Sequence, residues 1–329
     1  MHAIRIRLLP GAIALALALA ALPFSQAAPV AATTSGLYQA NCSANLRTRP
    51  STGATLKARI PANTVVRVSG IVSGSSYATT CRTGVSGSSW FVVTAIGGRS
   101  TSYLYGVAKL YIASKLVRSS WSSYLEGIDV SSWQSRIDFG RVRASGRSFV
   151  MAKASEGRYS SDSMYASHRS GAAAAGLAFA AYHFARPDAT PNDAILEADN
   201  FIDSARLKHG DLLPVLDIER SGGLGTAALQ KWISAWLARV KARLGVKAII
   251  YTNRTFWRTH VGDSTAYAAA GYRLWVAHWD ATAPGLPAAG WDGTGWRAWQ
   301  YDSCGSVPGV SGCADLDRIR DPDLTAITY

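Results

Sequence analysis

From residue 126 to the end of the chain, short apolar runs alternate with longer amphipathic segments. The short runs predict strands that are buried on both faces of a sheet, and they lie at residues 148–154, 177–184, 212–219, 246–252, 274–278 and 297–301. Helices are predicted between them, at residues 164–175, 191–207 and 226–244. The last carries one apolar stripe at helical spacing, made by Leu229, Trp232, Ile233, Trp236, Leu237 and Val240. Repeated strand–helix units of this kind predict an α/β fold, a mostly parallel sheet with helices outside it.

The apolar run at residues 212–219 differs from the others because it ends in two acids, Asp217 and Glu219. Residues i and i+2 of a strand point to the same side, with Cα atoms about 6–7 Å apart. Carboxylates are seldom buried without a partner, so the pair indicates either a functional site or a strand that ends early with both acids in water. This stretch alone leaves both interpretations open.

Further acids decide between them. Adding residues 127–134 and 314–316 gives eight strand candidates, which predicts a closed barrel with several late helices short or absent. Four acids lie where such a barrel brings its strand ends together, namely Asp129, Asp217, Glu219 and Asp315. Other polar and aromatic residues are predicted to converge there, namely Lys153, Glu156, Tyr182, His183, Tyr251, Trp275, His278, Trp299, Gln300 and Tyr301. Acids among Tyr and Trp suit a groove that cleaves sugars, since glycoside hydrolysis needs one protonated and one ionised carboxyl group.

Residues 37–120 have a different pattern, in which short β-forming runs are separated by Gly and Ser. Runs at 64–68, 90–94 and 104–107 predict strands of a small barrel or sandwich. Between residues 28 and 125 there are ten basic residues and no Asp or Glu. We expect such a unit to attract an anionic polymer, although a solvated basic surface without a ligand is the alternative.

The first 27 residues are typical of a secretory signal, with Arg5 and Arg7 before an apolar core and a small-residue cleavage site at residues 25–27. A membrane anchor is the alternative, but the apolar core is short for one. Export also fits the four cysteines, for which proximity in sequence favours the pairs Cys42–Cys81 and Cys304–Cys313. A metal site is disfavoured, because no Cys-x-x-Cys pair or suitably spaced His is present.

Seven motifs resemble glycoside hydrolases of family 25, in the order of that family. They are GIDVSSWQ at 127–134, YHFARP at 182–187, VLDIE at 215–219, IYTN at 250–253, LWVAHW at 274–279, WQY at 299–301 and DLD at 315–317. The resemblance implies an irregular TIM-like barrel with eight strands and about five helices. It also implies a lysozyme (N-acetylmuramidase) that cleaves the β-1,4 bond between N-acetylmuramic acid and N-acetylglucosamine with retention of configuration.

The resemblance carries the family's four acids to Asp129, Asp217, Glu219 and Asp315. Glu219 is then expected to be the general acid and base, and Asp217 either the nucleophile or the holder of the substrate's N-acetyl group. Asp129 and Asp315 would bind substrate and tune this pair. Substrate contacts are expected from Tyr182, Tyr251, Trp275, Trp279, Gln300 and Tyr301. The two histidines His183 and His278 are interpreted as hydrogen-bonded strand-end residues, and Lys153 with Glu156 as an ion pair or a substrate contact.

Residues 37–118 resemble the bacterial SH3-like domain, which implies binding to the cell wall. The expected organisation is a signal peptide (1–27), a wall-binding domain (28–118), a linker (119–125) and a hydrolase barrel (126–329). We expect a secreted monomer that acts on peptidoglycan, binds an anionic wall polymer through the basic domain, and needs no cofactor, metal or nucleic acid. Two alternatives are a chitinase-type hydrolase, because such enzymes also use a strand-end Asp-x-Glu, and a wall-binding protein with an inactive barrel.

Overall fold

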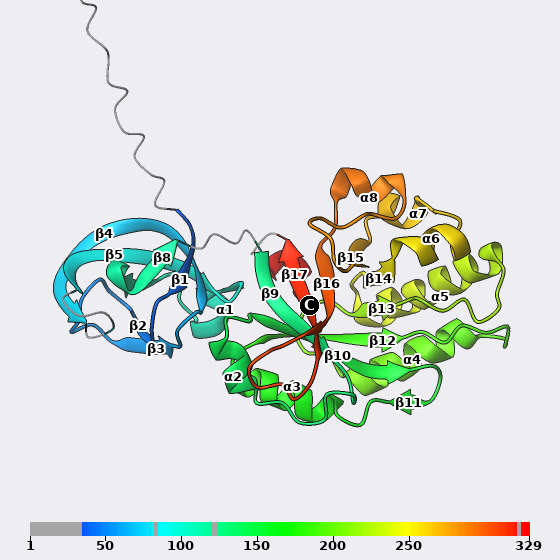
Figure 1. The fold of residues 1–329 in the computed structure, drawn as a ribbon, viewed down its shortest axis with the longest axis horizontal. Helices are drawn as coiled ribbons and strands as arrows, with labels where there is room; N and C mark the ends of the chain where they lie inside the picture. Colours follow the sequence, from blue (N-terminus) through cyan, green and yellow to red (C-terminus); the bar gives the residue numbers. More distant parts are fainter. Residues whose placement is uncertain (1–34, 80, 82–84, 120–123, 321–323) are drawn as a thin grey trace, which may run out of the picture. The chain divides into compact units, whose positions relative to one another are not determined.

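The computed structural model describes residues 35–79, 81, 85–119, 124–320 and 324–329 (Figure 1). The predicted signal peptide lies outside the described residues, as do residues 120–123 of the predicted linker. Within the described residues, no helix has the length and apolar character needed to cross a membrane. Both predicted disulfides, Cys42–Cys81 and Cys304–Cys313, are present.

The N-terminal part is an antiparallel sheet with the strand order β3-β2-β7-β5-β4-β1-β8, and β6 pairs with β5. Its strands are β1 (Gly36–Ala40), β2 (Ala44–Arg47), β3 (Leu56–Ile60), β4 (Val65–Thr79), β5 (Val85–Ile96), β6 (Arg99–Ser100), β7 (Leu110–Ala113) and β8 (Val117–Ser119). Alternate residues of β4 and β5, such as Val66, Val68 and Val93, fill its apolar core. The β-rich character predicted for this part is observed, and its resemblance to the SH3-like domain remains a prediction.

The prediction of a strand at residues 104–107 is wrong, because α1 (Thr101–Tyr105) occupies its first two residues and the other two belong to no strand. The Ser100 side chain accepts a hydrogen bond from the backbone N–H of Tyr103 and caps the helix start. Gly106, with φ 68°, ends the helix by donating to the carbonyl of Ser102. These two caps stabilise one helical turn in a segment whose residues favour strands.

Residues 124–320 form a closed barrel of eight strands. Seven are parallel to one another, namely β9 (Tyr124–Val130), β10 (Phe149–Glu156), β12 (Ala178–Phe184), β13 (Val215–Asp217), β14 (Ile249–Asn253), β15 (Arg273–Ala277) and β16 (Ala298–Gly305). The eighth, β17 (Ala314–Arg320), is antiparallel to β16 and β9 and closes the barrel. A two-residue strand, β11 (Ser160–Ser161), pairs with the end of β10. The predicted irregular barrel is confirmed.

Helices cover the outside of the barrel (Figure 1). They are α2 (Phe139–Ala144), α3 (Tyr165–Ala174), α4 (Asp193–Ala205), α5 (Thr226–Leu244), α6 (Arg254–His260), α7 (Ala266–Ala269) and α8 (Ala289–Thr294). A short 3-10 helix, η2 (Leu324–Ile327), follows β17. The three longest helices lie where the sequence predicts them, and the late ones are short as expected. Pro191 precedes α4 instead of occupying its first turn.

Alternation along the strands separates two apolar layers. Phe149 and Met151 of β10 point into the barrel with Tyr182, whereas Val150 and Ala152 pack outward against the helices. The predicted stripe of α5, from Leu229 to Val240, is buried in this outer layer. The same alternation decides which residues at the strand ends face the barrel interior.

Candidate active site

The carboxyl end of β13 places one acid inside the barrel. Val215 belongs to the interior cluster, so Asp217, two residues later, points to the same side, while Leu216 packs outward. Asp217 is buried at 6% exposure, and Glu219, beyond the strand end, is half-buried. The strand that was predicted to end at residue 219 therefore ends at Asp217. The two acids also differ in their access to solvent.

A hydrogen-bonded chain links the floor of the barrel to its rim through Gln300. The Gln300 side-chain amide donates to Asp129 Oδ2 at 2.7 Å. Its Oε1 accepts from the Tyr251 hydroxyl at 3.0 Å and from the Trp279 indole N–H at 2.9 Å. Four of the predicted site residues, carried by different strand ends, thus form one network. The chain fixes the orientation of the Gln300 amide, because its oxygen accepts both bonds.

The antiparallel direction of β17 brings Asp315 to this end of the barrel. Asp315 is the Cα partner of Asp129, and the two side chains are hydrogen-bonded. The sequence predicted a strand of only three residues here, and it did not predict that this strand runs antiparallel to its neighbours. Because β17 starts where the parallel strands end, its first residues lie with their last ones.

A fifth acid, Asp317, was missed by the sequence analysis. It is fully buried, its Oδ1 accepts from the Trp275 indole N–H at 2.9 Å, and it is hydrogen-bonded to Asp129. Asp317 lies two residues after Asp315, so the i, i+2 rule that linked Asp217 to Glu219 also predicts that Asp317 points inward. The three carboxyl groups Asp129, Asp315 and Asp317 are called the aspartate cluster below.

Burial controls the protonation of these groups. It is the first cause that raises the pKa values of Asp129, Asp217 and Asp317 well above their ordinary value, and neighbouring acids add to it. Burial and the neighbouring Asp129 raise the pKa of Asp315 to about 8. Two carboxyl groups can hydrogen-bond only through a shared proton, so the cluster holds protons at neutral pH.

Glu219 has a separate environment. Burial raises its pKa, and the charges of Arg220 and Arg186 act in the opposite direction. It lines a cavity of about 460 Å³ with Tyr251, Asn253, Arg254, Thr255, Ala277, His278, Trp279 and Asp280. Glu219 is therefore an acid with a raised pKa beside a space that a ligand can enter.

Two of the predicted substrate residues have other surroundings. Trp275 is only 2% exposed and donates to Asp317, with edge contacts to Tyr182 and Tyr251. Tyr182 is also buried, with a pKa raised by burial and by the nearby acids. Both contribute to the floor under the acids instead of an open surface.

Tyr301, a predicted substrate contact, packs on the outer side of its strand. Its hydroxyl donates to Glu126 Oε2 at 2.9 Å, and the Arg318 guanidinium lies 4.0 Å from its ring centroid. Because Gln300 points into the barrel, its neighbours Trp299 and Tyr301 point outward and pack with the outer apolar layer.

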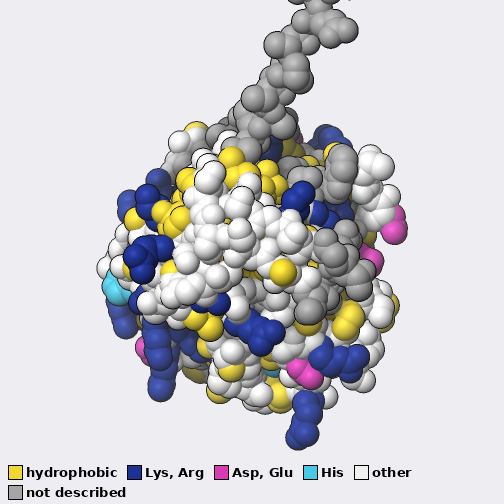
Figure 2. Space-filling view, turned by 90° about the vertical axis from the view of Figure 1, so that its left-hand side faces the viewer, with side chains coloured by type: hydrophobic (Ala, Val, Ile, Leu, Met, Phe, Trp, Pro, Cys, Tyr) yellow, Lys and Arg dark blue, Asp and Glu magenta, His cyan; other side chains and the backbone are white. Residues whose placement is uncertain are grey.

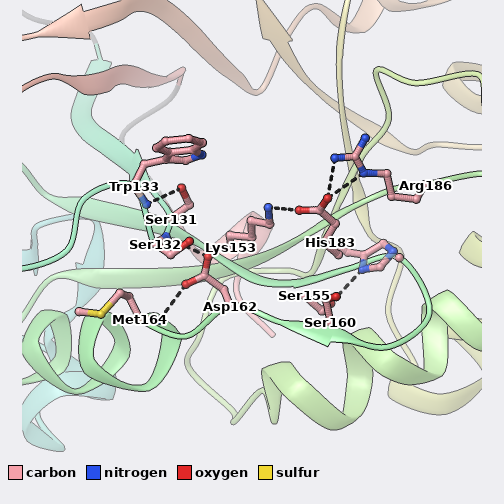
Figure 3. A network of polar contacts seen from close by, with 12 residues as sticks. Ser131, Ser132, Trp133, Lys153, Ser155, Ser160, Asp162, Met164, His183 and Arg186 are labelled. Carbon is pink, nitrogen blue, oxygen red and sulfur yellow. Dashed lines mark hydrogen bonds and ion pairs between the residues drawn. The ribbon is translucent and has the colours of Figure 1, made fainter.

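The remaining predicted polar residues have structural partners, and Figure 3 shows those of Lys153 and His183. Glu156 binds both Lys153 and Arg186, which agrees with an ion pair. His183 is buried between Ser155 and Glu197, at 2.9 and 2.8 Å. His278 accepts a hydrogen bond from the backbone of Gly285 at 2.7 Å. Both histidines are hydrogen-bonded strand-end residues, as predicted.

The chain is similar to known proteins in both sequence and fold. Residues 128–310 match the sequence profile of glycosyl hydrolases family 25. Lysozyme M1 of Streptomyces globisporus is 39% identical over 206 residues, covering 60% of this chain and 67% of its own. The N,O-diacetylmuramidase of a Chalaropsis species is 35% identical over 179 residues, covering 51% and 83%. A solved bacterial lysozyme from Streptomyces coelicolor superposes with a TM-score of 0.56 and 35% identity, covering 62% of this chain and 98% of that one.

Proposed function

The chain belongs to glycosyl hydrolases family 25 and is a glycoside hydrolase of the lysozyme type that acts on peptidoglycan. From this we propose which bond the enzyme cleaves and by which mechanism. The bond is the β-1,4 linkage between N-acetylmuramic acid and N-acetylglucosamine, cleaved with retention of configuration. The observation that carries the proposal is Glu219, an acid with a raised pKa that lines a ligand-sized cavity.

Glu219 is proposed as the general acid that protonates the leaving oxygen and then as the base that activates water. Its raised pKa supports the first role, because a protonated carboxyl group is required at the start of the reaction. Arg186 and Arg220 limit that rise, so Glu219 can also return to the ionised form that the second step requires.

Asp217 is proposed as the partner of Glu219 on the anomeric side of the substrate. Its Oδ1 is buried and has no hydrogen-bond partner among the described residues. A buried carboxyl oxygen without a partner is costly, so a substrate group that contacts it would be bound favourably. In one route, Asp217 would attack the anomeric carbon. In the other, Asp217 would accept a hydrogen bond from the N–H of the substrate's acetamido group, and the carbonyl oxygen of that group would attack the anomeric carbon. Mass spectrometry of a trapped intermediate distinguishes a glycosyl-enzyme from a free oxazoline.

Asp129 and Asp315 are proposed to bind substrate hydroxyl groups and to tune Asp217. The Gln300 chain supports this role for Asp129, because it connects that carboxyl group to the exposed rim residue Trp279. Tyr251 lines the same cavity as Glu219 and donates to Gln300, which supports its predicted contact with substrate.

The N-terminal sheet is proposed to bind an anionic wall polymer, in a protein that is secreted and monomeric. The charge distribution supports this proposal. All 21 acidic residues of the chain lie at or after Glu126, so the residues before it carry basic side chains and no acidic ones. On the face drawn in Figure 2, Lys and Arg side chains are widely distributed and Asp and Glu are few. Sedimentation of the full chain with purified walls should weaken as salt is raised, and retention that is independent of salt would contradict an ionic contact.

The decisive experiment is mass spectrometry of the fragments released from purified peptidoglycan. Fragments ending in reducing N-acetylmuramic acid are expected, and activity on chitin instead would favour the chitinase-type alternative.

Glu219→Gln should lower the rate by about 10²–10⁴-fold, since it removes the proton but keeps the shape of the side chain. A variant with most of its activity would exclude Glu219 as the acid. A wild-type protein that binds walls and releases nothing would favour the inactive barrel.

A further inference from the structure

Exposed aromatic side chains of the barrel gather at one end. Among the described residues from 124 onward, the aromatic side chains with the greatest exposure are Trp133 at 90%, Tyr159 at 83% and Trp279 at 49%. They follow the carboxyl ends of β9, β10 and β15 by two or three residues. These strands are parallel, so all three rings belong to the end of the barrel that holds the acids. A ligand that covers an exposed aromatic ring removes apolar surface from water, which favours binding.

Trp133 is presented by a turn whose backbone N–H groups are all hydrogen-bonded. The four consecutive backbone N–H groups of residues 131–134 all donate within the protein. Their acceptors are Gln134 Oε1 at 3.0 Å, Asp162 Oδ2 at 2.9 Å, Ser131 Oγ at 3.3 Å and the Ser131 carbonyl at 3.0 Å, in that order. The indole ring of Trp133 is 90% exposed, and Figure 3 shows it on the side of the turn away from Asp162 and Met164.

Three separate elements hold this turn in place. Asp162, which follows β11, also accepts from the backbone of Met164 at 2.9 Å. His168 of α3 is hydrogen-bonded to the Gln134 carbonyl at 2.9 Å. The Gln134 side chain donates to the carbonyl of Cys313, within the loop closed by the Cys304–Cys313 disulfide, at 3.2 Å. These contacts fix the backbone of the turn, so binding at Trp133 does not have to order the loop that carries it.

The order of strands around the barrel places Trp133 far from the cavity of Glu219. That cavity is built by residues at the carboxyl ends of β14 and β15 and by residues that follow β13, β14 and β15. In the closed ring β9-β10-β12-β13-β14-β15-β16-β17, strand β9 stands opposite β14. A linear ligand that occupies the cavity and crosses the mouth of the barrel therefore reaches the turn of Trp133 on the other side.

We propose that Trp133 is the stacking platform of a distal sugar subsite, which binds a pyranose ring of the glycan strand several residues away from the cleaved bond. This inference rests on the proposed function, since it assumes a β-1,4-linked amino-sugar polymer in the cavity. The indole offers a flat apolar face that matches the C–H face of a pyranose, while the sugar hydroxyl groups stay in water. The subsite makes the enzyme prefer long glycan strands to short oligosaccharides.

The test compares long peptide-free glycan strands with the shortest oligosaccharide that the wild type cleaves. Trp133→Ala should raise the KM for long strands about 3–10-fold, the value of one aromatic contact, and leave kcat unchanged. The KM for the short oligosaccharide should not change, and Trp133→Phe should recover most of the affinity. Leu196→Ala, an exposed apolar residue of α4, is the matched control and should behave as the wild type.

Binding is measured separately from catalysis in a Glu219→Gln background, where the dissociation constant for long strands should rise by the same factor on adding Trp133→Ala. An unchanged dissociation constant would overturn the proposal. An equal loss for long and short substrates would also overturn it, because the turn would then act through Asp129, four residues earlier, instead of as a platform. Failure of the proposed function would look different, as a wild type that releases no reducing ends from either substrate.

Discussion

Replacing Asp315 with Asn should make the protein more stable at neutral pH. Burial and the neighbouring Asp129 raise the pKa of Asp315 from 3.8 to about 8 in the folded chain. At pH 7 the carboxyl group of Asp315 is ionised in the unfolded chain. In the folded chain it is protonated, because its pKa there lies above 7. Folding therefore takes up a proton, which costs free energy at that pH. Asn presents an N–H donor to Asp129 without that cost.

The magnitude follows from the span between pH 3.8 and pH 7. At 1.36 kcal/mol per pH unit this span is worth at most about 4 kcal/mol. Partial exposure of Asp315 and proton sharing with Asp129 reduce it, so we expect a gain of about 1–3 kcal/mol. The melting temperature should rise by roughly 2–10 °C at pH 7.

The sign of the pH dependence provides the sharper test. Because the folded state binds more protons between pH 3.8 and about 8, the contribution of Asp315 to stability is greatest at low pH and declines across that window. The difference in melting temperature between Asp315→Asn and wild type should be small near pH 4 and grow toward pH 8. Differential scanning calorimetry over this range measures it, with Asp203→Asn on the exposed face of α4 as control. A difference that does not vary with pH, or a variant less stable at pH 7, would refute the reasoning.

Two further predictions concern stability. Converting Cys304 and Cys313 together to Ser should lower the free energy of unfolding by about 2.5 kcal/mol, because it reopens a loop whose ends are nine residues apart; urea denaturation measures this, and an unchanged midpoint would contradict it. His183→Ala should cost about 3–5 kcal/mol, since Glu197 would stay buried without its partner at 2.8 Å. A loss below about 1 kcal/mol in the same assay would show that the backbone N–H of Arg186, which donates to the same Glu197 oxygen at 3.0 Å, is a sufficient partner.

Much of the barrel was predictable because its strands and helices are locally encoded. Helix α5 begins at Thr226 and ends at Leu244, as its apolar stripe predicts, and a stripe of this spacing has few alternatives to a buried helix face. The two disulfides agree with the pairs that proximity in sequence favours. The helix at residues 101–105 was missed because its stability comes from two caps, Ser100 and Gly106, and not from the periodicity of its residues.

The sequence by itself determined which acids and aromatic residues reach the ends of strands, since that depends on short apolar runs and on the residues directly after them. Only the tertiary structure decided how each of these side chains is oriented and paired. The reversal of β17 brought Asp315 and Asp317 beside Asp129, and the inward orientation of Gln300 turned Tyr301 away from the site. Strand direction and facing depend on partners far away in the sequence, and burial, which sets the pKa values of these acids, depends on all of them together.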